Sequence, residues 1–221
     1  MSKVVNPFSH RLGILRDWRH RWFATGVKYQ QYLKSDILLR EFLQRELRGM
    51  YIGAIGFERN DKALRVIIKT SRPGLIIGRS GEGSVKLRNS IVSFLRKKKL
   101  PVPEIKLDIE EIRSPESNAF IVAYMVAEGL EKRLPFRRVL KQTIEKVMAN
   151  RDVKGVRIAL AGMLGGGSMS RNEELKKGQV PLQTFRSDID FARERANLPL
   201  GVIGVKVWIY RGEVFEKEVE K

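Results

Sequence analysis

The sequence predicts an α+β fold in two parts, and three observations lead to this prediction. Segments with a helical period and segments that alternate between apolar and polar residues occur in both halves of the chain. The chain has 221 residues, of which 43% are hydrophobic, so it can form two small domains or one large domain. Ser114 and Pro115 form a natural boundary between the two parts.

The first part is predicted to contain a helix, a hairpin, a second helix and a strand. The first helix is expected to start at Ser35 and Asp36 and to stop at Gly49, after a basic and aromatic segment. Two strand-like runs follow and form the hairpin, and the second helix and the last strand come after a glycine-rich turn. The ranges of these later elements are 51–57, 64–69, 85–95 and 105–109.

The second part is predicted to contain two helices and then mainly strands. Pro115 is expected at a first helical position, and Pro135 separates the two helical segments. The predicted helices cover 119–130 and 136–150, and the predicted strands cover 156–164, 180–186 and 201–210. The expected domains are therefore residues 1–113 and residues 114–221.

Composition restricts the function before any motif is considered. Forty-three Lys and Arg against 25 Asp and Glu give a net charge of +18, which predicts a polyanionic partner: nucleic acid or an anionic membrane surface. The absence of cysteine and the presence of only two histidines leave little for a metal site or a nucleophilic triad. We therefore expect no catalytic residues, no metal and no cofactor. The first residues lack a secretory signal, and we expect a cytoplasmic protein.

The sequence Gly78-Arg79-Ser80-Gly81 is the strongest local motif. Neither a P-loop nor a dinucleotide-binding fingerprint fits, because the required lysine and third glycine are missing. An apolar pair precedes the motif and a helix follows it, which is the context of the GXXG loop in KH domains. Two glycines let a sugar–phosphate strand approach the backbone closely, and the alternative is an ordinary glycine turn.

A second basic motif begins the helix predicted after Pro135. Lys141 follows Arg137 by four residues and Arg138 by three, so the three side chains can share one helix face. Phe136 and Leu140 point to the other side of the helix. The alternative is an ordinary solvated charged face. Few acidic residues balance this run, which weakens that alternative.

Other basic residues are candidates for contact with nucleic acid. They are Arg11, Arg16, Arg19, Arg21, Arg72, Arg171, Lys176 and Lys177. Trp18, Trp22 and Phe23 lie among the N-terminal arginines, and we expect them to anchor this segment to its own core rather than to stack on bases. The run from Gly165 to Ser168 is expected to form a flexible hairpin tip.

Several segments together resemble the family of bacterial small-subunit ribosomal protein three. They are RPGLIIGRSGE (72–82), HRLGI near the start, FRRVLK (136–141), VPLQTFRSDIDF (180–191) and GVIGVKVWIYRGE (201–213). The matches follow the same order from the first dozen residues to the last dozen. This resemblance implies a KH type II domain followed by a second α+β domain with two helices packed on a mainly antiparallel sheet.

The resemblance also implies a function and partners. The protein would be a structural component of the small-subunit head, bound to small-subunit rRNA beside the channel where mRNA enters. Gly78, Arg79, Ser80 and Gly81 would form the KH loop, and Arg137, Arg138 and Lys141 would face the incoming mRNA. Neighbouring partners would be ribosomal proteins ten and fourteen, with no membrane and no small-molecule substrate.

The chain departs from the family pattern at several positions. Ser80 stands where many relatives carry a second lysine, and Met163 replaces the arginine of an Arg-Leu-Gly-Gly sequence. Glu173 and Glu174 add acidity where an aromatic pair is common, and a lysine-rich tail is missing. These departures weaken the expected RNA contacts at the same places.

Two other functional classes remain as alternatives. A nuclease with a KH module would need a metal-binding acid cluster or a general base, and the sequence offers neither convincingly. A peripheral membrane protein would need a basic amphipathic helix with exposed bulky apolar residues. The longest apolar stretch, from Ala119 to Leu130, is too short to span a bilayer.

Overall fold

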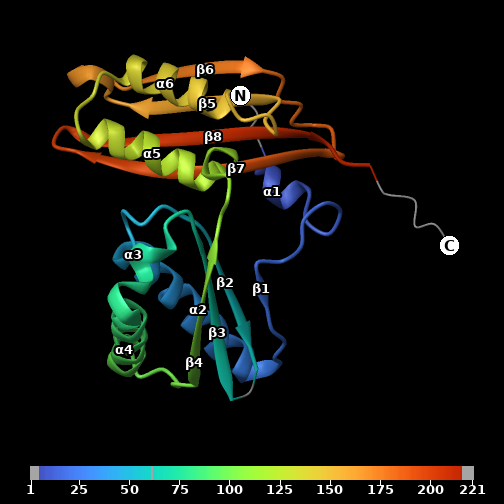
Figure 1. The fold of residues 1–221 in the computed structure, drawn as a ribbon, viewed down its shortest axis with the longest axis vertical. Coiled ribbons are helices and arrows are strands. Elements are labelled where there is room, and N and C mark those ends of the chain that lie inside the picture. Colours follow the sequence, from blue (N-terminus) through green and yellow to red (C-terminus); the bar gives the residue numbers. More distant parts are fainter. Residues whose placement is uncertain (1–4, 61, 216–221) are drawn as a thin grey trace. The chain divides into compact units, whose positions relative to one another are not determined.

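The chain folds into two compact units, each of which is described by itself. The structure is a computed structural model that describes residues 5–60 and 62–215 (Figure 1). Unit A consists of the described residues in 18–113, and unit B combines residues 5–17 with residues 114–215. Both units mix helices with a four-stranded sheet, which confirms the predicted α+β class.

Unit A contains a sheet in the order β1-β2-β3-β4. The strands are β1 (His20–Arg21), β2 (Ile52–Arg59), β3 (Ala63–Thr70) and β4 (Glu104–Glu111). β2 and β3 pair antiparallel and β3 pairs parallel with β4, so the predicted hairpin and the last strand of this part are confirmed. Burial alternates along β3 because every second side chain faces the helices.

The helices of unit A provide the other half of its core. They are α2 (Gly26–Glu46), the short α3 (Pro73–Ile77) and α4 (Glu82–Lys97). Leu39 and Leu43 of α2 and Ile91 of α4 are fully buried in the same cluster as Phe57 and Ile68 of the sheet. The order helix–strand–strand–helix–helix–strand is that of a type II KH domain, and the α3–α4 junction carries the GXXG motif.

The predicted start of the first helix is wrong. α2 begins at Gly26, and Ser35 and Asp36 lie buried within it rather than capping it. Asp36 accepts a hydrogen bond from the guanidinium of Arg59, which also bonds to the Ser35 hydroxyl. Burial raises the pKa of Asp36, and the Arg59 charge only partly opposes that shift. Ser35 and Asp36 have the residue types of a helix N-cap, but here both bind the buried guanidinium of Arg59.

Unit B is built on an antiparallel sheet in the order β6-β5-β8-β7. The strands are β5 (Gly155–Gly162), β6 (Arg171–Gly178), β7 (Ser187–Leu198) and β8 (Gly201–Glu213). Two helices, α5 (Ala119–Glu131) and α6 (Phe136–Met148), cover one face of this sheet, as Figure 1 shows. The predicted architecture of two helices on a mainly antiparallel sheet is thereby confirmed.

Two details of unit B differ from the sequence-based expectations. Residues 180–186 do not form a strand; they connect β6 to β7, and the backbone carbonyls of Leu182 and Thr184 bind a side chain instead of a neighbouring strand. Pro115 starts a short 3-10 turn (Pro115–Ser117), and Asn118 caps α5 by accepting a hydrogen bond from Phe120 N at 3.0 Å.

The N-terminal segment belongs to unit B in this structure. The expected domain of residues 1–113 included this segment, so the structure differs from that expectation for residues 5–17. The reason is Arg11, which follows the single-turn helix α1 (Pro7–His10). Its guanidinium is fully buried and donates to the carbonyl oxygens of Ser187 at 2.6 Å and Thr184 at 2.8 Å.

The aromatic residues after this segment do not all anchor it. Trp22 contacts the rings of Tyr29 and Tyr32 of α2. Phe23 is 88% exposed, so the expected anchoring role is wrong for this side chain, whereas Trp18 is 62% exposed and lies outside the buried core of unit A.

Candidate nucleic-acid interface

The GXXG loop is a tight reversal between α3 and α4. Gly78 and Gly81 have positive φ angles of 70° and 80°, which a side chain would strain. Gly83 lies so close to the Ile76 carbonyl oxygen that a Cβ atom would overlap it. The two helices therefore cross at backbone contact distance, and this close crossing fixes the loop between them.

The loop presents a basic residue beside apolar surface. Arg79 and Ser80 are exposed, and no carboxylate of the described chain forms an ion pair with Arg79. Leu75, Ile77 and Val85 flank the loop and are also exposed, at 55%, 38% and 58%. Proteins that bind single-stranded nucleic acid place cations beside the phosphates and apolar side chains against the bases, and the loop provides both.

Charge reversal in the loop tests its role directly. Replacing Arg79 and Ser80 by Asp puts two negative charges where a sugar–phosphate strand would lie, so affinity for short single-stranded RNA is expected to fall. The fold should persist, since both side chains are exposed and aspartate tolerates the positive φ of 53° at Ser80. Filter binding with the full chain measures the loss. Unchanged affinity of a folded variant would exclude the loop from the interface.

The second basic site lies on α6, where buried and exposed residues separate cleanly. Val139, Leu140, Ile144 and Val147 are buried against the sheet of unit B. Arg137, Arg138 and Lys141 are all exposed, and the structure places them on the outer side of the same helix. The buried stripe holds the helix in one orientation, so these three cations are presented from a rigid element.

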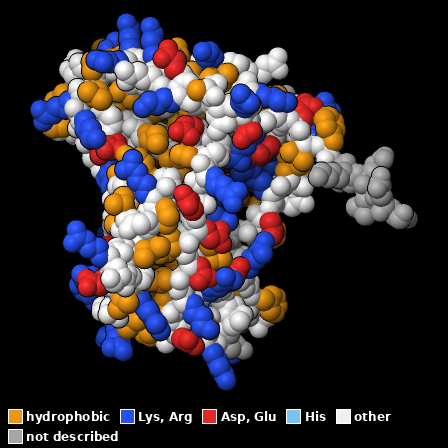
Figure 2. Space-filling view, viewed as in Figure 1, with side chains coloured by type: hydrophobic (Ala, Val, Ile, Leu, Met, Phe, Trp, Pro, Cys, Tyr) orange, Lys and Arg blue, Asp and Glu red, His pale blue; other side chains and the backbone are white. Residues whose placement is uncertain are grey.

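One of the three cations is partly neutralised. An Arg137 Nη atom lies 3.8 Å from the Glu173 carboxylate of β6, and the Arg137 guanidinium also lies 5.7 Å from the centre of the Phe136 ring. Across the described residues, Arg138 and Lys141 form no ion pair. Glu173 therefore reduces the positive charge that Arg137 can offer to a phosphate, whereas the charges of Arg138 and Lys141 are not reduced in this way. Figure 2 shows Lys and Arg side chains over the part of unit B that holds α6 and β6.

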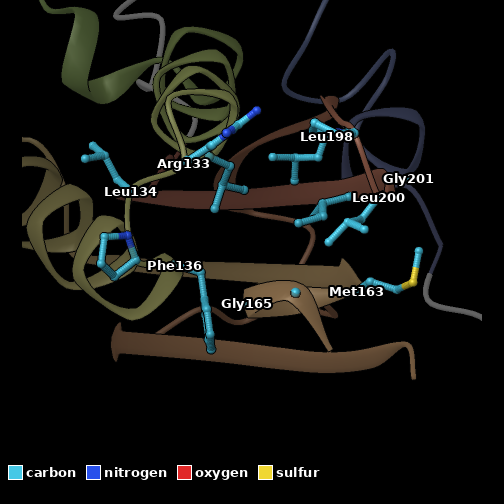
Figure 3. Close-up of a pocket in the computed structure, with 13 residues that line it drawn as sticks. Arg133, Leu134, Phe136, Met163, Gly165, Leu198, Leu200 and Gly201 are labelled. Atoms are coloured by element: carbon cyan, nitrogen blue, oxygen red, sulfur yellow. The ribbon is translucent and has the colours of Figure 1, made fainter. Parts of the chain in front are cut away.

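An apolar pocket of about 620 Å³ lies beside the start of α6 (Figure 3). Phe136 lines it, together with Leu198 and Leu200 from the β7–β8 turn and Gly165 from the loop after β5. Arg133 is the one ionisable residue that lines it. The pocket therefore presents no acid–base pair.

Two N-terminal candidates are not available for RNA. Arg11 is fully buried, and its nitrogen atoms all donate to backbone carbonyls. The Arg16 side chain is 17% exposed and pairs with Asp188 at 2.7 Å and Asp190 at 3.1 Å. Burial opposes its charge, but the two carboxylates outweigh that effect and raise the pKa of Arg16. Both arginines fasten the N-terminal segment to unit B, which corrects their prediction as RNA contacts.

The remaining candidates are exposed, except for the half-buried Arg19, and occupy different elements. Arg72 stacks over the Tyr51 ring at 4.6 Å, and Arg171 donates to the Leu164 carbonyl at 3.2 Å. Arg21 is exposed in β1 and Arg19 is half-buried just before it. Lys176 and Lys177 are exposed and point to opposite faces of β6.

The sequence analysis missed a group of cations on the sheet of unit B. Arg157, Arg193 and Lys206 come from three different strands and share the face that α5 and α6 leave uncovered. Along β8, Lys206 stands between Val205 and Val207, and this local alternation was the signal that could have identified this face.

The part of the chain that the structure describes holds neither a metal site nor a membrane-spanning helix. No group of three His, Asp or Glu side chains there could hold a metal ion. None of the helices in the same residues is both long and apolar enough to cross a membrane.

Comparison with protein families assigns both units. Residues 38–117 match the family described as KH domain, and residues 126–209 match the family described as ribosomal protein S3, C-terminal domain. Similar proteins include "Small ribosomal subunit protein uS3" of Methylococcus capsulatus, 41% identical over 98% of this chain and 94% of the relative. The uS3 proteins of Ectopseudomonas mendocina and Clostridium acetobutylicum are 40% and 36% identical and cover the whole of this chain.

Proposed function

This chain belongs to the uS3 family of small ribosomal subunit proteins, and from that premise we propose how it contacts RNA. The family is one of structural ribosomal proteins rather than enzymes, so the protein is a structural constituent of the small subunit. We propose that it binds small-subunit rRNA in the head and holds mRNA at the entrance of the channel. In this function it is bound to ribosomes in the cytoplasm.

The triplet on α6 carries the proposal for mRNA. Arg138 and Lys141 are exposed and unpaired within the described residues, and Arg137 is restrained by a long ion pair with Glu173 and by the neighbouring Phe136 ring. Cations fixed on a rigid helix hold a single strand through its phosphates without reading its sequence. A strand held in this way is not free to re-anneal, so the cations oppose duplex formation at the entrance while the ribosome supplies the work of translocation.

The KH loop and the exposed basic residues support the proposal for rRNA. Arg79 sits in a loop whose geometry admits a sugar–phosphate strand. Arg21 and Arg72 are exposed elsewhere on unit A, and Lys176 and Lys177 are exposed on unit B. Ribosomal proteins ten and fourteen are the proposed neighbours, on the basis of the family alone. The nuclease alternative has no observation in its favour.

The net charge gives a direct test of RNA binding. With +18 on the chain, we expect affinity for RNA to be mainly electrostatic and to fall steeply as salt increases. The slope of log affinity against log salt should be about −0.7 for each phosphate contacted on a single strand. Titrations at several salt concentrations measure it. An affinity that is constant between low and physiological salt would contradict the proposal.

A further inference from the structure

The face of the unit B sheet that α5 and α6 leave uncovered carries more cations than carboxylates among the described residues. Side chains on this face come from alternate positions of four neighbouring strands. The pairing register defines it: Lys176 lies opposite Arg157, Ala159 opposite Lys206, and Lys206 opposite Arg193. Among the residues that the structure describes, the cations on this face are Lys176, Arg157, Arg193, Arg195 and Lys206, and the one carboxylate is Glu174.

The single carboxylate is already occupied. Glu174 binds Arg157, with 2.5 Å between an Arg157 Nη atom and the carboxylate. Glu174 lies two strands away from Lys206, which is about 10 Å at the usual strand spacing. Lys206 and Arg193 therefore have no acidic partner on this face.

Arg193 and Lys206 form an unfavourable pair within the protein. They lie directly opposite each other on β7 and β8, and both are exposed. Like charges at opposed positions of an antiparallel pair destabilise the sheet. A repulsive pair without an internal counterion indicates that an external anion neutralises it.

The shape of this face favours a flat polyanion over a protein. Between the cations lie small residues, Ala159, Ala161 and Gly204, and the nearest atom to a Cβ built on Gly204 is 3.8 Å away. The aromatic side chain of Trp208 on the same face is 6% exposed, and the exposed apolar residue there, Val202, is a single small side chain at the end of the sheet, so the face offers no aromatic anchor to a partner protein. Protein interfaces depend on exposed aromatic or apolar anchors, whereas phosphate contacts need only cations and close approach.

We propose that this face, centred on Arg193 and Lys206, binds the sugar–phosphate backbone of RNA. The proposal rests on the proposed function in rRNA binding and names a surface for it that is separate from the KH loop and from the α6 triplet. Because the contacts are to phosphates, binding here should be independent of RNA sequence.

The test compares two variants with the same loss of charge. In the first, Arg193 and Lys206 are both replaced by Gln; in the control, the exposed Lys97 and Lys98 at the end of α4 are replaced by Gln. Full-length proteins are titrated with a small-subunit rRNA transcript and with an RNA duplex of unrelated sequence, at several salt concentrations. We expect the salt slope of the sheet variant to be smaller by about 2 on both RNAs, and that of the control to be unchanged.

Thermal unfolding separates a binding role from a structural one. Removing the repulsive pair should leave the Tm of the sheet variant equal to or above that of the wild type. If the sheet variant keeps the salt slope of the unmodified protein, this inference alone is overturned. If the unmodified protein itself does not bind rRNA, the proposed function is overturned as well. A further outcome is that the sheet variant binds RNA normally but fails to enter reconstituted subunits. That result would show that the face docks a protein, and it would also overturn the inference.

Discussion

Ribosomes in which Arg137, Arg138 and Lys141 of this protein are all replaced by Ala are expected to translate structured mRNA several-fold more slowly. The same ribosomes should translate an unstructured message at nearly the wild-type rate. The physical reason is that the three cations hold separated strands by their phosphates, so their loss matters only where a duplex can re-form. In vitro translation of paired templates, with and without a hairpin, measures the ratio of the two rates.

Assembly should not be affected by these substitutions. Val139, Leu140, Ile144 and Val147, which pack α6 on the sheet, are unchanged. A matched control replaces Lys146, which is exposed near the end of the same helix, by Ala. Equal slowing on both templates would mean that the triplet acts in assembly or in general binding, and the role at the mRNA entrance would be abandoned.

The largest loss of stability is expected from replacing Asp190 by Ala. Asp190 is 3% exposed, and its carboxylate accepts hydrogen bonds from Arg16 at 3.1 Å, from Ala119 N at 2.9 Å and from Arg211 at 3.3 Å. Its removal leaves two arginines and the start of α5 without this partner. We expect the free energy of unfolding to fall by about 2–4 kcal/mol, since the arginines retain some solvent and keep Asp188.

Asp188 provides the control for this prediction. It pairs with the same two arginines, but its side chain is 23% exposed and receives no helix N–H. Replacing Asp188 by Ala should therefore lower the free energy of unfolding by about 1 kcal/mol or less. Chemical denaturation of both variants measures the difference. Equal losses would show that Asp190 does not connect the N-terminal segment, β7 and α5 as the structure indicates.

The sequence predicted those features that depend on local periodicity. The spacing of Arg137, Arg138 and Lys141 was enough to place them on one helix face, because the neighbouring apolar residues follow the same period. The GXXG loop was also predictable, since glycines at 78 and 81 precede a well-patterned helix. Both motifs that the proposed function uses, the GXXG loop of unit A and the cations on α6 of unit B, were therefore predictable from the sequence.

Features that depend on long-range contacts were not predictable in this way. Arg11 has the sequence context of a surface cation, and only the carbonyl oxygens of a segment more than 170 positions away make it a buried residue. Strand β6 escaped prediction because it lies at the sheet edge and carries mostly charged residues. Asp36 resembled a helix cap, but Arg59 on β2 binds it inside the core.

Photo-crosslinking from α6 in the ribosome is the most direct test of the central claim. A photoreactive residue replaces Gln142, which is exposed one turn after Arg138, and the equivalent replacement at the exposed Asp152 serves as control. Small subunits that contain the tagged protein are isolated on sucrose gradients and programmed with labelled mRNA. The account predicts co-sedimentation with the small subunit and a crosslink from position 142 to mRNA downstream of the decoding site, with none from position 152. A protein that remains at the top of the gradient, or crosslinks from position 142 to rRNA or protein alone, would contradict it.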